Sequence, residues 1–243
     1  MAGFTLTELA VVLAIVGLLI GGAMMTLSAQ YEQRNHDETV HRLNAAADAV
    51  LAFAMVNGRL PCPAVGGATG DEAPAGGGNC TTYFAGFLPA RTIGVQPVDS
   101  AGYAVDVWGN RIRYAVANSI TGCTGPSNTP HFTNAANLKA NGVSCRPSDL
   151  DVCAPVDTGT ACTTANRLAS AQTIGFLVFS TGKNGAISAA HGPHDLGNLD
   201  GNAGFISHPP SGSDAPTGAF DDLMVFVPVA VLYARLIAAG ALP

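Results

Sequence analysis

Four aspartates near the end of the chain have the right chemistry for a hard cation. Asp221 and Asp222 are adjacent, and Asp195 and Asp200 lie in the Gly/Pro/Asp-rich segment before them. Calcium takes six to eight oxygen ligands, mostly from carboxylates and carbonyls. Asp221 and Asp222 are therefore candidate calcium ligands, with Asp195 and Asp200 as further oxygen donors. The alternative is a pair of solvated acids where a loop meets a strand.

Three histidines in the same region suggest a different metal. His191 and His194 flank a Gly-Pro pair, and His208 follows. Imidazole suits zinc or copper. The Gly-Pro pair keeps the first two histidines from sharing a helical face, so exposed loop histidines are the favoured interpretation.

The chain lacks the motifs of the common enzyme classes. It contains no Gly-x-Ser-x-Gly, no His-Glu-x-x-His and no Gly-x4-Gly-Lys-Ser/Thr loop. Asp195 or Asp214 with His208 and a serine could imitate a hydrolase triad, but almost any chain of this length offers such a set. The net charge is −6 and no basic cluster occurs, which argues against nucleic-acid binding. We expect neither an enzyme nor a nucleic-acid partner.

A glutamate precedes a long apolar run near the N-terminus. The nineteen residues from Leu9 to Leu27 carry no charge and one hydroxyl, Thr26. As a helix the run is roughly 28 Å long, near the thickness of a bilayer's hydrocarbon core. A carboxylate such as Glu8 at the edge of this run is costly without a partner. These features predict a helix that spans a membrane over about 9–27, then leaves it and packs beside copies of itself.

The same helix is predicted to continue well beyond the apolar run. A stripe at i, i+3, i+7, i+10, i+11 and i+14 consists of Val40, Leu43, Ala47, Val50, Leu51 and Ala54. Asn57-Gly58 and Pro61 then supply a stop. We expect one helix over 4–56, about 80 Å long, whose second half packs its stripe against a head domain, 57–243.

Residues 3–8, Gly-Phe-Thr-Leu-Thr-Glu, together with the apolar run, resemble the N-terminal signature of type IV pilins and type II secretion pseudopilins. The resemblance implies that residues 1–3 are a leader. It also implies that a prepilin peptidase cuts between Gly3 and Phe4 and methylates the new amino group of Phe4. Glu8 would neutralise that ammonium on a neighbouring subunit, because two buried opposite charges together cost less than either alone.

The leader departs from the family pattern, and two other N-terminal segments remain as alternatives. Met1-Ala2-Gly3 has none of the Lys or Arg residues of family leaders, so we expect it to be truncated or to start upstream. A secretory signal peptide has a shorter apolar core of about 7–15 residues. A plain single-span anchor would not require Glu8.

Six cysteines lie outside the apolar run, with no Cys-x-x-Cys among them. An even number spread through loops favours disulfides in an oxidising compartment over metal binding. Six cysteines allow fifteen pairings, and we predict the sequential one: Cys62–Cys80, Cys123–Cys145 and Cys153–Cys162. Free buried thiols are the alternative.

The head is predicted to mix strands with loops. Residues 103–116 fit a strand, a Gly109-Asn110 turn and a strand. Ile174–Ser180 fits a buried strand, Leu223–Val227 another, and Val229–Ala239 a closing helix, while 118–170 and 181–219 fit loops. The predicted fold class is α+β, with a long N-terminal helix packed on a small antiparallel sheet and disulfide-rich loops.

A weaker resemblance lies in the head. The element from Asp106 to Tyr114, Asp-Val-Trp-Gly-Asn-Arg-Ile-Arg-Tyr, is similar to one in the major pseudopilin of type II secretion. Residues 179–185 with Asp221-Asp222 stand where that family has a Gly/Asp loop and a calcium site. Lys183 and Asn184 depart from that loop, and a lysine there argues against the ion.

Both resemblances imply a structural subunit of minor pilin or pseudopilin type, in a type IV pilus or a type II secretion pseudopilus. Its partners would be other subunits, the prepilin peptidase, an inner-membrane assembly platform and, before assembly, the membrane. Its implied location is the inner membrane, as a single-pass protein with a periplasmic head, and afterwards an extracellular filament. The alternatives are a tip adhesin or substrate-binding minor pilin with the 118–219 loops as its surface, and an enzyme on a single anchor.

Overall fold

The computed structural model describes residues 5–67, 69–118, 120–121, 130–156, 159–185 and 191–242, without the side chains of 22–29, 120 and 121. The chain divides into two compact units, Met1–Glu38 and Thr39–Pro243. The first helix, α1 (Leu6–Asn57), has 52 residues, and its part from Thr39 onward belongs to the second unit. The other helices are α2 (Ala90–Ile93), α3 (Ala135–Asn141), the 3-10 turn η1 (Gly142–Ser144), α4 (Pro193–Leu199) and α5 (Val229–Ala238). The strands are β1 (Gly86–Phe87), β2 (Arg113–Val116), β3 (Ile120–Thr121), β4 (Arg146–Pro147), β5 (Asp151–Cys153), β6 (Ile174–Ser180), β7 (Gly204–Ile206) and β8 (Leu223–Pro228).

The predicted membrane span over 9–27 is wrong. None of the helices in the described ranges is both long enough and apolar enough to cross a membrane. The same finding contradicts the predicted localisation. That prediction was a single-pass inner-membrane protein with a periplasmic head, which afterwards becomes part of an extracellular filament.

The second unit is built on a four-stranded antiparallel sheet in the order β1-β2-β6-β8. All seven residues of β6 are buried, as expected of an uninterrupted apolar run in a central strand. The mixture of helices with a small antiparallel sheet confirms the predicted class at that level. The first half of the predicted 103–116 hairpin is not a strand. It forms single bridges such as Val105 to Arg111, because the chain turns at once, with the Asp106 amide donating to the Asn110 carbonyl.

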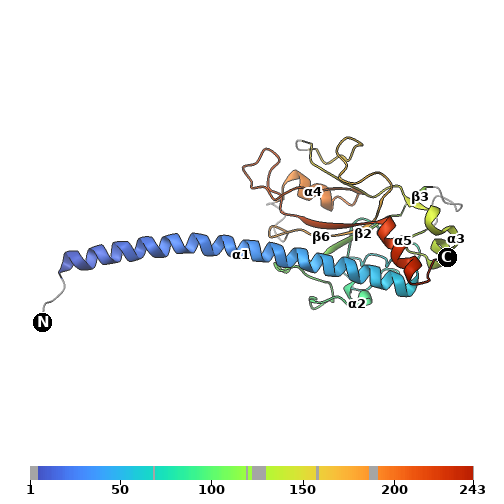
Figure 1. Ribbon diagram of the computed structural model, residues 1–243, viewed down its shortest axis with the longest axis horizontal. Helices are drawn as coiled ribbons and strands as arrows, with labels where there is room; N and C mark the ends of the chain where they lie inside the picture. Colours follow the sequence, from blue (N-terminus) through green and yellow to red (C-terminus); the bar gives the residue numbers. More distant parts are fainter. Residues whose placement is uncertain are drawn as a thin grey trace. The chain divides into compact units, whose positions relative to one another are not determined.

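The predicted stripe of α1 forms part of the core. Leu43, Val50 and Ala54 are fully buried, in one cluster with the sheet and with Leu232 and Leu236 of α5. In Figure 1 the second half of α1 lies along one face of the sheet, while α4 lies on the opposite side. The 3.6-residue periodicity is therefore explained by packing within the head unit.

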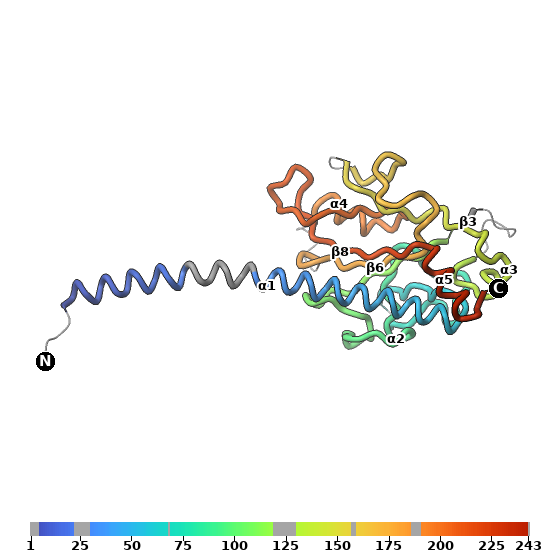
Figure 2. The backbone as a smooth tube through the Cα atoms, viewed as in Figure 1, coloured from blue at the N-terminus to red at the C-terminus, as the bar shows by residue number. Residues whose placement is uncertain are grey.

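The face that carries α4 holds a second layer (Figure 2). There β5 and β7 pair in parallel, and the Phe205 ring of β7 meets the Phe179 ring of β6 edge-on at 5.5 Å. Helices α3 and α4 both fall in segments predicted to be loops. The layer matters because it brings residues 191–206 onto the same side of the sheet as the loop after β6.

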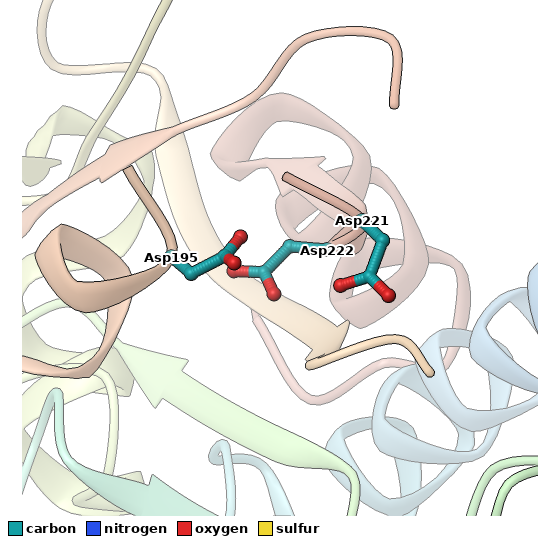
Figure 3. A group of neighbouring side chains, drawn as sticks. All are labelled: Asp195, Asp221 and Asp222. Atoms are coloured by element: carbon teal, nitrogen blue, oxygen red, sulfur yellow. The ribbon is translucent and has the colours of Figure 1, made fainter. Parts of the chain in front are cut away.

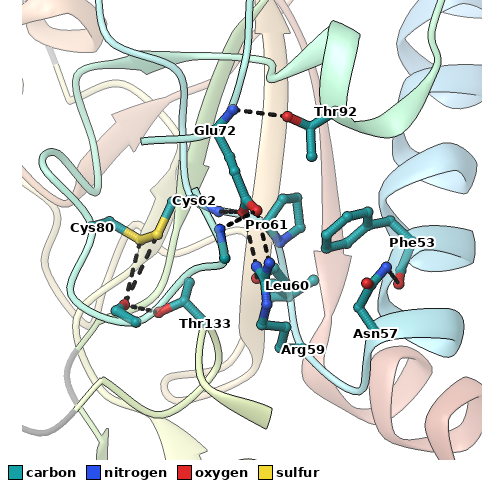
Figure 4. Close-up of polar contacts among 12 residues, drawn as sticks. Phe53, Asn57, Arg59, Leu60, Pro61, Cys62, Glu72, Cys80, Thr92 and Thr133 are labelled. Carbon is teal, nitrogen blue, oxygen red and sulfur yellow. Dashed lines mark hydrogen bonds and ion pairs between the residues drawn. A yellow bond between two sulfur atoms is a disulfide. The ribbon is translucent and has the colours of Figure 1, made fainter. Parts of the chain in front are cut away.

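A buried ion pair and a disulfide fix the chain after α1 (Figure 4). Arg59 and Glu72 form a two-pronged pair at 2.8 and 2.7 Å, and Cys62 is bonded to Cys80. The Cys153–Cys162 disulfide is also present, so two of the three predicted pairs are confirmed. Cys123 lies outside the described residues, and its pairing stays a prediction.

Candidate metal centre

Three aspartates distant in sequence converge at one point (Figure 3). Asp195 lies in the first turn of α4, and Asp221 and Asp222 come directly before β8. One carboxylate oxygen from each lies within 4.8 Å of the others. Asp200 does not join them, because it accepts hydrogen bonds from the amide and side chain of Asn202. The structure thus brings three of the four candidate acids together and leaves Asp200 outside the cluster, while calcium binding stays a prediction.

Each of the three carboxylates is held through one oxygen, Oδ2. The donors are the Asn184 side chain (2.9 Å) and the Gly192 amide (3.2 Å) for Asp195, the Asn184 amide (3.0 Å) for Asp221, and the Asn198 side chain (2.7 Å) for Asp222. Hydrogen bonds of this kind orient a carboxylate before any ion arrives.

The second oxygen, Oδ1, of each carboxylate is buried and accepts no hydrogen bond within the described part of the chain. Asp195 and Asp222 are only 1% and 4% exposed. Buried acceptors without a donor are rare in folded proteins and costly, and they point to a missing water or ion. Three carboxylate oxygens close together repel one another, whereas a cation between them would be coordinated by all three.

The electrostatics of the cluster lead to the same conclusion. Burial raises the pKa of Asp222 well above its usual value, and the neighbouring carboxylates add to that shift while the Asn198 hydrogen bond opposes it. Burial also raises the pKa of Asp221, with a further contribution from Asp195. A divalent ion would remove the repulsion between the carboxylates, which adds to both shifts.

The set of donors suits calcium. All three are carboxylates, the hard ligands that Ca²⁺ prefers. Lys183, a residue type unfavourable in a calcium loop, is exposed rather than buried with the carboxylates. The Asp195, Asp221 and Asp222 oxygens would hold the ion, and its charge would hold α4 against the start of β8.

The loop after β6 supports the cluster from below. Gly182 has a φ of +63°, and a Cβ there would lie 2.4 Å from the Asp221 carboxyl carbon, so this position requires glycine. The loop is fastened to the turn of Asp106. The Ser180 hydroxyl donates to the Asp106 carboxylate (2.6 Å), and the Asn110 side chain donates to the Gly182 carbonyl (2.6 Å).

The three histidines do not meet at one metal position. His194 and His208 are hydrogen-bonded to each other at 3.0 Å. The His208 ring stacks on Phe220 at 3.9 Å, and its Nδ1 lies 2.8 Å from the Pro209 carbonyl. His191 stands apart on the wall of a cleft. This arrangement is typical of packing. The expectation of exposed loop histidines is wrong for His194, which lies in α4 and is fully buried.

At the other end of the chain, Glu8 caps its own helix. The Glu8 Oε2 accepts from the Thr5 amide (2.9 Å) and hydroxyl (2.7 Å), and the Glu8 amide donates to the Thr5 hydroxyl oxygen (3.3 Å). This is a capping box, and these hydrogen bonds lower the pKa of Glu8. Gly3 and Phe4, the predicted cleavage site, lie outside the described residues.

One signal for Asp195 was present in the sequence. A glycine, a proline at the first helical position and an acid two residues later mark a helix start, and Gly192-Pro193-His194-Asp195 has that order. Comparison with protein-family models, with curated proteins and with solved structures finds no match for this chain.

Proposed function

We propose that this chain is a structural subunit of the pilin or pseudopilin kind. It assembles with other subunits through the first part of α1 and carries a calcium-pinned head. The observation that supports assembly is the apolar surface of α1 before Gly21. Leu6 and Leu18 are 86% and 78% exposed, and the consecutive Val11, Val12 and Leu13 are exposed as well.

Consecutive residues on a helix point about 100° apart, so this segment is apolar on every side. A helix that is apolar all round is stable only when other apolar surface covers it. Bundling with the same segment of neighbouring subunits would cover all sides at once. That is the mode of assembly the N-terminal resemblance implies.

Glu8 lies at a recess suited to such contacts. A shallow hollow of about 390 Å³ is lined by Thr7, Glu8, Val11 and Val12. In the proposed assembly the Phe4 ammonium of a neighbour enters this hollow and meets the Glu8 carboxylate. The Thr5 bonds keep Glu8 ionised beforehand, because they lower its pKa.

Calcium has a structural role in this proposal. The ion bridges α4 to the segment before β8, elements that are otherwise tied by the Asn198 to Asp222 bond. Pinning the loops gives each head one shape, which repeated lateral packing requires.

The intact mass of the non-reduced protein from its native host tests assembly-type processing. We expect a mass that begins at Phe4 with one added methyl and with six hydrogens lost to three disulfides. A chain that keeps residues 1–3, or that is cut elsewhere, contradicts the proposal. Glu8→Gln should leave the processed mass of the monomer intact while lowering incorporation into filaments, with Glu32→Gln as the matched control.

A second candidate function is a binding subunit that uses the 118–219 loops. The observation in its favour is a cleft lined by Lys183, His191, Ser211, Ser213 and Phe220. Deletion of residues 209–218 would separate the two functions. If the chain is a binding subunit, the deletion variant should still enter the filament but no longer bind the ligand. If the head is purely structural, the wild-type chain should show no ligand binding at all.

A further inference from the structure

A cleft of about 800 Å³ adjoins the aspartate cluster. Its wall includes Asp221, one of the three candidate calcium ligands, together with His191, Ser211 and Ser213. This volume is typical of pockets for small molecules, about 300–1,000 Å³. The metal centre and the cleft therefore share a side chain.

Among the described residues, the three carboxylates supply only part of the coordination that calcium needs. Three carboxylates contribute at least three oxygens, and Ca²⁺ takes six to eight. Asp195 and Asp222 are buried, whereas Asp221 is half-buried and faces the cleft. The remaining positions of the ion therefore open on the side of Asp221, where oxygens of a ligand can reach them.

His191 indicates what kind of ligand fits. Both of its ring nitrogens are buried and have no hydrogen-bond partner in the described ranges, so the half-buried ring turns toward the cleft to meet a ligand. A neutral imidazole has one donor and one acceptor, and a hydroxyl group can satisfy either. Adjacent hydroxyls on one molecule could serve His191 and the ion together.

Charge favours a neutral ligand. A divalent ion among three carboxylates leaves one negative charge on the site, which repels an anion. An anion would gain little from an ion whose charge is already offset. Neutral hydroxyl oxygens are hard ligands and bring no repulsion with them.

The wall of the cleft is held in place before any ligand binds. Ser211 and Phe220 exchange two backbone hydrogen bonds of 2.8 and 2.9 Å, and the Ser211 hydroxyl donates to the Gly218 carbonyl at 2.9 Å. Gly192 packs so tightly that a Cβ there would lie 2.0 Å from the Ala219 carbonyl oxygen. Such a wall loses little entropy on binding.

We propose that this cleft binds a neutral sugar whose adjacent hydroxyls complete the coordination of the calcium ion. The inference rests on the calcium site of the proposed function. It goes beyond that site in assigning the ion a ligand and the cleft a chemical class.

The test is saturation-transfer NMR on the full chain, in calcium and then in excess EDTA. The probes are D-mannose, D-glucose, D-galactose, L-fucose and lactose. Calcium binding by titration calorimetry is measured in parallel. We expect at least one sugar to give a signal in calcium that EDTA abolishes. Asp221→Asn should remove both calcium and sugar binding.

His191→Ala separates the cleft from the metal. It should keep calcium binding and weaken the sugar about tenfold, the effect of one lost hydrogen bond. His41→Ala, an exposed histidine on α1, is the matched control and should change neither. Calcium binding without any sugar signal, or a signal that survives EDTA, overturns this inference alone. A wild-type chain that binds no calcium overturns the metal site as well, while assembly is judged separately by the Phe4 mass.

Discussion

Removing Glu72 should cost the head unit a large part of its stability. Its carboxylate accepts four hydrogen bonds, two from the Arg59 guanidinium and one each from the Cys62 and Gly76 amides (Figure 4). Burial alone would raise the pKa of Glu72, but the Arg59 bonds and charge lower it below its usual value. The pair therefore remains ionised although its side chains are only 10% and 6% exposed.

The expected magnitude follows from what Glu72→Ala leaves behind. Arg59 would stay buried without its counter-charge, a loss of about 3–5 kcal/mol for broken buried pairs. A domain of ordinary stability has about 5–15 kcal/mol in total. With a urea dependence near 2 kcal/mol/M, the unfolding midpoint should fall by roughly 2 M.

Urea unfolding of the full, oxidised chain, followed by far-UV circular dichroism, measures this shift. Asp71→Ala is the matched control, because Asp71 and Arg91 form an exposed pair at 3.6 Å, which is worth about 0–1 kcal/mol. The cycle of Arg59→Met, Glu72→Gln and the double variant isolates the coupling. A loss for Glu72→Ala no larger than that for Asp71→Ala would refute the reasoning.

Four further predictions concern the head. Calcium at a hundred times its dissociation constant should raise the free energy of unfolding by about 2.7 kcal/mol, and thermal melts of Asp222→Asn should show no such gain. Because the pKa of Asp222 is raised in the folded state, the free energy of unfolding of the ion-free protein should fall as the pH rises from 3.8 through that pKa. Over the same pH window the calcium affinity, measured by calorimetry, should rise. A calcium affinity that falls in this window contradicts the site. Gly182→Ala should weaken calcium binding about 10–100-fold by displacing Asp221, and an unchanged calorimetric affinity would contradict the close approach. Burial lowers the pKa of His131 from 6.5 to about 4, so its ring resonances in an NMR pH titration should shift with a midpoint near pH 4. The free energy of unfolding should decrease as the pH falls from 6.5 toward that value. An NMR midpoint near 6.5 would contradict the burial.

Local patterns predicted the elements that are apolar and regular. The stripe from Val40 to Ala54, the apolar run Ile174–Phe179 of β6 and the helix after Pro228 can each be recognised from the apolar pattern of a few neighbouring residues or turns. Helices α3 and α4 were missed because polar and glycine residues dilute that period. Asn134, whose side chain accepts from the Asn137 amide at 3.1 Å, is a cap that only becomes visible once the helix is known.

The sequence identified the aspartates of the metal centre as candidates but not which of them lie together. Adjacency made Asp221 and Asp222 a candidate pair, but Asp195 joins them only because α4 packs beside the end of β7 through Asn198. Asp200 has the same chemistry and lies five residues further on, yet it serves a local turn. Composition could not separate the two, since tertiary packing decides which acid faces the cluster.

Trp108 gives the molecule its own optical probe. It is the only tryptophan in the chain, and its amide donates to Asp106, the residue that also holds Ser180. The next link, from Asn110 to the Gly182 carbonyl, reaches the loop beneath Asp221. Tryptophan fluorescence therefore originates from this one position, which is linked to the aspartates through a short series of covalent and hydrogen bonds. Its emission can report changes in the loop after β6 without an added label.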